Sequence, residues 1–174
     1  AKQRAEQLVT NIRAALKGLP VSGIRHVESR IVVELEDTAV ADEAAARLRR
    51  VYGLVWISPA VRIGRDQVDG ELAEDLATKA APRLSAVCAA AIALAERDRG
   101  AAANFKIDTR RSDRTFPITS LDISREVGRA VHEACRLPGR MAQPDFVVNV
   151  LVLREAVLVF TGKIQAYGGL PAGS

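Results

Sequence analysis

A strand, an arginine-rich loop and the start of a helix follow one another directly in residues 105–120. The apolar pattern predicts a strand at 104–108, and Thr119 or Ser120 can cap a helix that runs to about residue 136. Three arginines lie on the loop between them: Arg110, Arg111 and Arg114. This order indicates a mixed α/β unit whose loop lies where rigid scaffolds commonly carry binding residues. Guanidinium groups suit bidentate contacts to phosphate, although such a cluster is also typical of a plain charged surface.

Helical and strand periodicities alternate along the rest of the chain. The predicted helices are 2–17, 39–51, 69–81 and 84–97. The predicted strands are 30–34, 54–63 (interrupted by Pro59), 146–153 and 156–164, the last two joined by a tight turn. The pattern indicates an α+β protein with a ferredoxin-like domain at 1–66, either complete or without its first strand, a small α/β domain at 67–166, and a linker at 167–174.

Composition and charge exclude several classes of protein. Hydrophobic residues make up 48% of the 174 residues, which is typical of a folded chain. The net charge of +4 permits a nucleic-acid partner without requiring one. No signal-peptide core is visible at the start, and the most apolar run, 84–95, is too short to span a bilayer. Cys88 and Cys135 lie far apart in helical patterns, so we expect reduced thiols and a cytoplasmic location.

The helix that follows the arginine-rich loop carries a second series of cations. Its apolar positions repeat at helical spacing, and four cations fall on another face: Arg125, Arg129, His132 and Arg136. Such a line extends about 16 Å and can match phosphates along one nucleic-acid strand. The alternative interpretation is pairing within the helix, because Asp122 and Glu126 alternate with the arginines.

Motifs for catalysis are absent from the sequence. Neither His26 nor His132 has metal-ligand spacing, and no glycine-rich nucleotide loop or nucleophile elbow occurs. We therefore expect no catalytic residue, no metal and no cofactor in these residues. Phe116 either plugs the core or stacks on an unpaired base, and its position before Pro117 favours the core.

Several segments together resemble a known family. Residues 105–128 resemble the signature of the THUMP domain, an RNA-binding module of tRNA-modifying enzymes, and 144–150 resemble a later part of that module. Residues 8–16 and 51–59 are similar to the ferredoxin-like domain of tRNA sulfurtransferases, which make 4-thiouridine. Residues 167–173 resemble the linker to that family's catalytic domain, whose Ser-Gly-Gly-x-Asp-Ser motif this sequence does not contain.

The resemblance implies a chain that docks the acceptor stem and the unpaired terminus of tRNA for thiolation by a catalytic domain that these residues lack. The implied RNA contacts are Lys106, Arg110, Arg111, Arg114 and Ser120, joined by the helix cations Arg125 and Arg129, with Arg4, Arg13 and Lys17 for the acceptor stem. The resemblance leaves the oligomeric state open between a monomer and a homodimer, because family members often dimerise. The alternatives are an adaptor that delivers tRNA to a separate catalytic subunit, such as an acetyltransferase or methyltransferase, and a small enzyme with an unfamiliar site.

Overall fold

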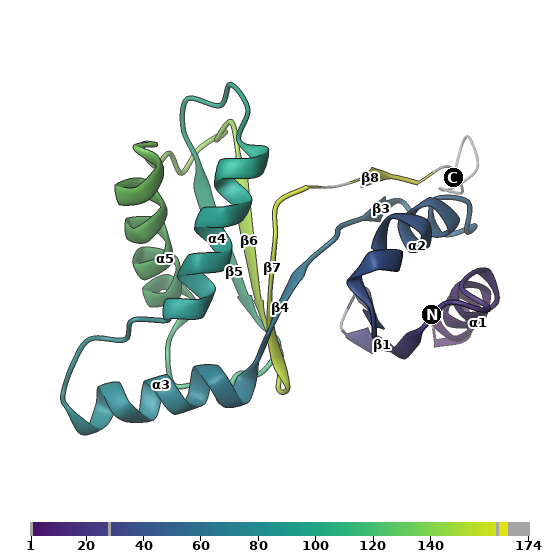
Figure 1. Ribbon diagram of the computed structural model, residues 1–174, viewed down its shortest axis with the longest axis horizontal. Helices are drawn as coiled ribbons and strands as arrows, with labels where there is room; N and C mark the ends of the chain where they lie inside the picture. Colours follow the sequence, from purple (N-terminus) through teal and green to yellow (C-terminus); the bar gives the residue numbers. More distant parts are fainter. Residues whose placement is uncertain (1, 28, 163, 167–174) are drawn as a thin grey trace. The chain divides into compact units, whose positions relative to one another are not determined.

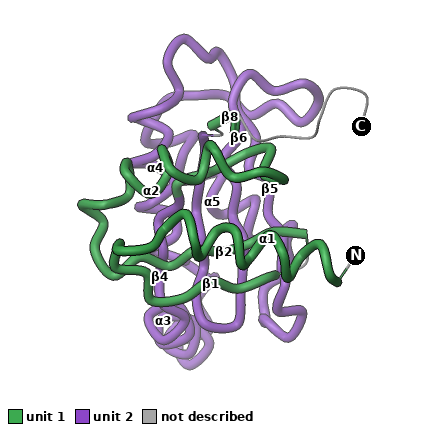
Figure 2. Tube along the Cα trace, turned by 90° about the vertical axis from the view of Figure 1, so that its right-hand side faces the viewer, with its two compact units in different colours: residues 1–59, 163–174 green, residues 60–162 purple. Residues whose placement is uncertain are grey.

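The computed structural model describes residues 2–27, 29–162 and 164–166 of the chain. These residues form two compact units, which are coloured separately in Figure 2. The first unit contains the described residues up to Pro59 together with 164–166, and the second unit is Ala60–Gly162. The chain therefore leaves the first unit, forms the second, and returns to the first.

The first unit combines helices with two pairs of antiparallel strands. Its elements are α1 (Lys2–Ala15), β1 (Val21–Val27), β2 (Arg30–Leu35), the 3-10 turn η1 (Thr38–Val40), α2 (Ala41–Leu48), β3 (Trp56–Ile57) and β8 (Ile164–Gln165). Strand β1 pairs with β2, and β3 pairs with β8. The buried core consists of Ile12, Leu16, Ala44, Leu48 and Val51. The helical spacing of these residues explains why α1 and α2 turn one face inward.

The second unit is a four-stranded sheet with helices. Its elements are β4 (Val61–Gly64), α3 (Arg65–Ala77), α4 (Ser85–Asp98), β5 (Lys106–Arg111), α5 (Ser120–Cys135), β6 (Val147–Val152) and β7 (Ala156–Phe160). The strand order is β4-β7-β6-β5, in which β5 runs parallel to β6 and the other pairs are antiparallel. Strand β5 is therefore an edge strand, and its last residues lie beside the last residues of β6.

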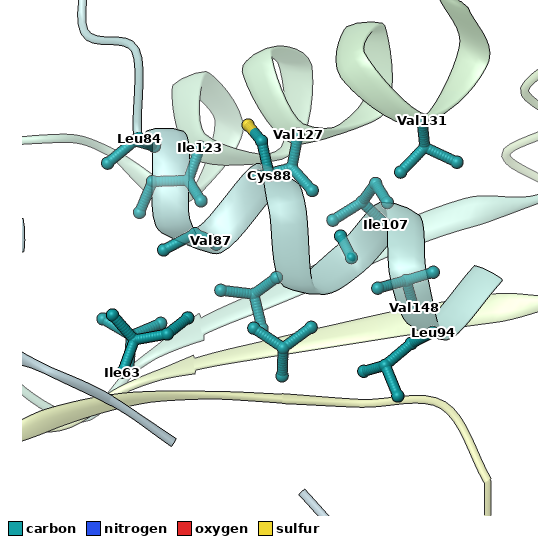
Figure 3. Close-up of a cluster of buried hydrophobic side chains, with 14 of the residues drawn as sticks. Ile63, Leu84, Val87, Cys88, Leu94, Ile107, Ile123, Val127, Val131 and Val148 are labelled. Atoms are coloured by element: carbon teal, nitrogen blue, oxygen red, sulfur yellow. The ribbon is translucent and has the colours of Figure 1, made fainter. Parts of the chain in front are cut away.

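The core of the second unit lies between the sheet and the helices α4 and α5, which cover the same face of the sheet (Figure 1). Figure 3 shows Val87 and Cys88 of α4 and Val127 of α5 among the side chains that meet Ile107 and Val148 of the sheet. Burial raises the pKa of the Cys88 thiol to about 11, so this cysteine stays protonated and acts as a small apolar side chain.

The α+β class expected from the sequence is confirmed, but several strands differ from the expected ones. Strand β5 is Lys106–Arg111 instead of 104–108, and β7 ends at Phe160 instead of 164. The stretch 54–63 is divided into β3 and β4, which belong to different sheets. Pro59 lies between them and lacks the N–H that a continuous ladder needs. The sequence does not predict β1, because Ser22, Gly23 and His26 interrupt its apolar pattern.

Helix α3 begins and ends four residues earlier than the expected 69–81. The buried carboxylate of Asp75 accepts hydrogen bonds from Nε and the backbone N–H of Arg83, at 2.6 and 3.1 Å. Glu71 accepts from the backbone N–H of Ser85 at 2.8 Å and thereby caps α4. These contacts fix the corner between α3 and α4. The domain limits 1–66 and 67–166 remain predictions, and the expected linker at 167–174 lies outside the described residues.

Candidate nucleic-acid interface

The loop between β5 and α5, residues 112–119, is anchored at both ends. It carries only Arg114, because Arg110 and Arg111 are the last two residues of β5 and not loop residues as the sequence predicted. We keep the name arginine-rich loop for residues 112–119. The backbone N–H groups of Ser112 and Asp113 both donate to the carbonyl of Val152 at the end of β6, at 2.9 and 3.2 Å. At the other end, Oγ1 of Thr119 accepts from the N–H of Asp122 at 3.1 Å and caps α5. The loop is thus held against the sheet and the helix that it joins.

Arg111 holds the loop from inside. Its Nη1 donates to the carbonyls of Phe116 and Ile118, at 3.0 and 3.2 Å, and the side chain is half-buried. Strand alternation places Arg111 on the same face of β5 as Ile107, which is the face covered by the helices. Among the predicted RNA contacts, Arg111 therefore has a structural role, because its hydrogen bonds hold the backbone of the loop.

Arg65 and Asp113 form a second, buried attachment of the loop, which we call the Arg65 clamp. Nη1 of Arg65 donates to Oδ2 of Asp113 and to the carbonyl of Leu153, both at 2.8 Å. The other oxygen of Asp113 accepts from the N–H and the hydroxyl of Thr115. The guanidinium of Arg65 also lies 4.8 Å from the ring centre of Phe116, which is buried in the core as the sequence favoured.

The Arg65 clamp predicts a pH dependence of stability. Hydrogen bonds from Thr115 and Arg65 lower the pKa of Asp113 from 3.8 to about 2. Because the folded state holds the charged form, Asp113 stabilises the fold above about pH 4, and this contribution is lost as the pH falls towards 2. The measurement is denaturant unfolding of the wild type and of Asp113→Asn across pH. The difference between them should be constant near neutrality and shrink below about pH 4; a difference that stays constant down to pH 2 would contradict the assignment.

Arg110 and Arg114 are the exposed cations of this region. The Arg110 side chain is 64% exposed and its nearest carboxylate oxygen, of Asp108, lies 4.0 Å away. Arg114 is exposed and forms no ion pair with any described residue. Lys106 is half-buried and lies on the same face of β5 as Arg110, four residues and about 13 Å earlier. These side chains keep their positive charge available at the edge of the sheet.

Arg154 is a cation at this end of the sheet that sequence reasoning missed. It is exposed in the turn between β6 and β7, which the hydrogen bond from the N–H of Leu153 to the carbonyl of Ala156 closes at 2.8 Å. Arg111, the last residue of β5, pairs with Val152 of β6, and Arg154 comes two residues after Val152. Only the parallel pairing of β5 and β6 brings this turn to the end of the sheet that carries the arginine-rich loop.

Arg125 and Arg129 of α5 are paired with carboxylates. Nη1 of Arg125 lies 3.6 Å from Asp122, and Arg129 bonds both Glu126 and Glu133, the latter at 2.9 Å. These carboxylates raise the pKa of Arg129. The pairing within the helix that the sequence offered as an alternative is therefore present. Ser120 is the first residue of α5 and is half-buried behind the Thr119 cap. The roles of these three predicted residues in RNA binding stay predictions.

The predicted contacts of the first unit lie along α1 and just beyond it. Arg4, Arg13 and Lys17 are all exposed. Arg13 and Lys17 are four residues apart and share a side of the helix, whereas Arg4 precedes Arg13 by nine residues, or about half a turn around the axis. The structure therefore brings two of the three together.

Neither a metal-binding cluster nor a membrane-spanning helix occurs in the described part of the chain. Nowhere in residues 2–27, 29–162 and 164–166 do three His, Cys, Asp or Glu side chains gather where they could hold a metal ion. None of the described helices has the length and apolarity needed to cross a membrane.

Comparison with known proteins identifies both units. Residues 2–58 match the ThiI ferredoxin-like domain, and residues 83–161 match the THUMP domain. A probable tRNA sulfurtransferase of Staphylococcus aureus (strain Newman) is 29% identical over 174 residues, which cover 99% of this chain and 38% of that protein. The chain thus spans well under half the length of this relative.

Solved structures share the fold. The crystal structure of PH1313 from Pyrococcus horikoshii Ot3 superposes with a TM-score of 0.71 at 25% identity, over 99% of this chain and 53% of that one. The crystal structure of a 4-thiouridine synthetase–RNA complex with bound ATP gives a TM-score of 0.67 at 22% identity, over 99% of this chain and 39% of that one. The two domain matches show that the chain contains a ThiI ferredoxin-like domain followed by a THUMP domain.

Proposed function

We propose that this chain binds tRNA and holds its acceptor stem and unpaired terminus for thiolation to 4-thiouridine. The observation that carries the proposal is the match of both domains, in order, to a probable tRNA sulfurtransferase along 99% of the chain. The fold is also shared with a 4-thiouridine synthetase that was crystallised with RNA. Sulfur transfer itself would be the task of residues beyond these 174, because the sequence contains no motif for it.

Three exposed arginines support an RNA contact in the THUMP domain. Arg110, Arg114 and Arg154 extend from β5, the arginine-rich loop and the β6–β7 turn at the same end of the sheet. Asp113, a carboxylate among them, is buried and already bonded to Arg65, so it does not neutralise the exposed arginines. Guanidiniums suit phosphates, and phosphate contacts fix the position of an RNA without depending on its sequence.

The proposal predicts the behaviour of Arg110→Ala combined with Arg114→Ala. Labelled tRNA, followed by fluorescence anisotropy at several salt concentrations, should bind the double variant at least tenfold more weakly at low salt. The slope of log affinity against log salt should also fall by about 1.5, because two phosphate contacts are lost. A tRNA without its unpaired terminus should bind more weakly to the wild type.

The matched control is Arg97→Ala. The Arg97 side chain is also 64% exposed, but it pairs with Asp98 at 2.7 Å. Asp98 in turn bonds Thr161, just after β7, so Arg97 lies at the other end of the sheet. The control should bind tRNA like the wild type. Equal affinities of the wild type and the double variant, with equal salt slopes, would refute this site, and no binding by the wild type would refute the function.

A further inference from the structure

An exposed aromatic surface lies on the first unit, between α2 and β3. Tyr52 is 61% exposed, Val55 43% and Trp56 53%, and we call these three side chains the aromatic patch. The phenylalanines of the described residues are all buried or half-buried, so the exposed aromatic rings of this part of the chain are gathered within five positions. Rings of this size normally contribute to a core, so two that stay exposed within five positions of the chain are candidates for contact with a ligand.

The backbone under the aromatic patch is fixed. Gly53 has φ +97°, and a Cβ there would lie 3.4 Å from the side chain of Leu8, so the turn requires glycine. The carbonyl of Val55 accepts from the N–H of Ala166 at 2.9 Å, and Trp56 pairs with Gln165 of β8. A ligand that covers these rings therefore has no loop to order, which lowers the cost of binding.

The surroundings of the aromatic patch are cationic. Residues 44–57 include Arg47, Arg49 and Arg50 and contain no carboxylate, and Arg47 is paired with a carboxylate just outside the segment, that of Glu43 at 2.9 Å. Nε of Arg49 donates to the carbonyl of Gln165 at 3.2 Å, which places a guanidinium beside the strand partner of Trp56. Arg50 is exposed and forms no ion pair with any described residue. Flat rings can stack on the aromatic groups of a ligand, and guanidiniums beside them can bind its negative charges. The segment therefore fits a polyanion that also carries aromatic rings.

We propose that the aromatic patch binds unpaired nucleotides of RNA, with Tyr52 and Trp56 stacking on bases and the neighbouring arginines contacting phosphates. Bases inside an A-form helix cover one another's faces, so the ligand is a single-stranded segment. The inference rests on the proposed RNA binding and extends it to a second contact, independent of the arginines of the THUMP domain.

Trp56 is the only tryptophan of the chain, so its fluorescence reports on the aromatic patch alone. A short single-stranded RNA oligonucleotide, titrated into the whole chain, should quench this fluorescence, whereas a blunt RNA duplex of equal charge should quench it much less. Tyr52→Ala and Trp56→Ala should each weaken binding of the oligonucleotide about fivefold to tenfold, as measured by anisotropy. Trp56→Phe, which keeps a ring, should bind more tightly than Trp56→Ala.

Leu76→Ala is the matched control, since Leu76 is a 70% exposed apolar side chain on α3. It should leave the affinity unchanged, and circular dichroism should show all variants folded. The inference would be overturned if Tyr52→Ala and Trp56→Ala both bound the oligonucleotide with wild-type affinity and the oligonucleotide left the Trp56 fluorescence of the wild type unchanged. If tRNA still bound in that case, the proposed function would stand. Quenching by anionic lipid vesicles or by a protein, but not by the oligonucleotide, would also overturn the inference.

Discussion

Replacement of Arg65 with methionine is expected to lower the free energy of unfolding by about 3 kcal/mol. The Arg65 side chain is 12% exposed and bonds both Asp113 and the carbonyl of Leu153 at 2.8 Å. Methionine keeps the length and apolar volume of the side chain but leaves a buried carboxylate without its cation. The loss therefore comes mainly from the uncompensated charge of Asp113. Denaturant unfolding of the 174-residue chain measures it.

Two further variants make this prediction specific. Adding Asp113→Asn to the Arg65 variant should recover part of the loss, since the buried charge is then removed. Arg97→Met should cost no more than about 1 kcal/mol, because its partner Asp98 lies on the surface with it. If Arg65→Met cost no more than Arg97→Met, the clamp would not contribute to stability.

Phe116→Ala is expected to destabilise the protein by about 3–5 kcal/mol. The ring of Phe116 is 3% exposed and belongs to the same core cluster as Leu84, Ile123 and Val152. Its removal leaves a cavity under the arginine-rich loop and takes away the surface on which the Arg65 guanidinium lies. Thermal or denaturant unfolding should show the loss.

Phe116→Leu separates the packing of Phe116 from base stacking. Leucine fills much of the same space, so this variant should regain most of the lost stability. It should also bind tRNA as tightly as the wild type, because a buried ring does not reach a base. Normal stability with a severalfold loss of tRNA affinity in Phe116→Leu would instead assign the ring to stacking, which was the alternative reading of the sequence.

Local periodicity was enough to predict the elements that carry the site. Helices α4 and α5 show apolar patterns, so their existence could be read from the sequence. Strand β5 was predicted from Phe105 and Ile107 alone, so its expected bounds of 104–108 miss the last three residues of the strand, Thr109–Arg111. The pairing of Arg125 and Arg129 also follows from spacings of three and four residues, and it was foreseen as an alternative. The strand pair β3–β8 was not foreseen, because each partner has two residues and no pattern of its own.

The roles of individual arginines depend on contacts between distant residues. Arg65 and Asp113 meet although 48 residues separate them, and nothing near either residue in the sequence announces the other. Arg111 bonds loop carbonyls whose positions exist only after the loop has folded. Arg154 reaches the end of β5 only through the parallel register of β5 and β6. Sequence reasoning could therefore name the arginine-rich loop but could not sort its arginines into those that shape it and those that face solvent.

The pairing of β3 with β8 has a consequence for the order of folding during synthesis. When Trp56 is added to the growing chain, its strand partner Gln165 has not yet been made, and more than a hundred residues must be translated first. The sheet of the THUMP domain, whose strands all lie between these two residues, can form in that interval. Closing so distant a pair costs chain entropy, and a folded intervening domain reduces that cost. We therefore expect the first unit to gain β8 after the sheet of the second unit has formed.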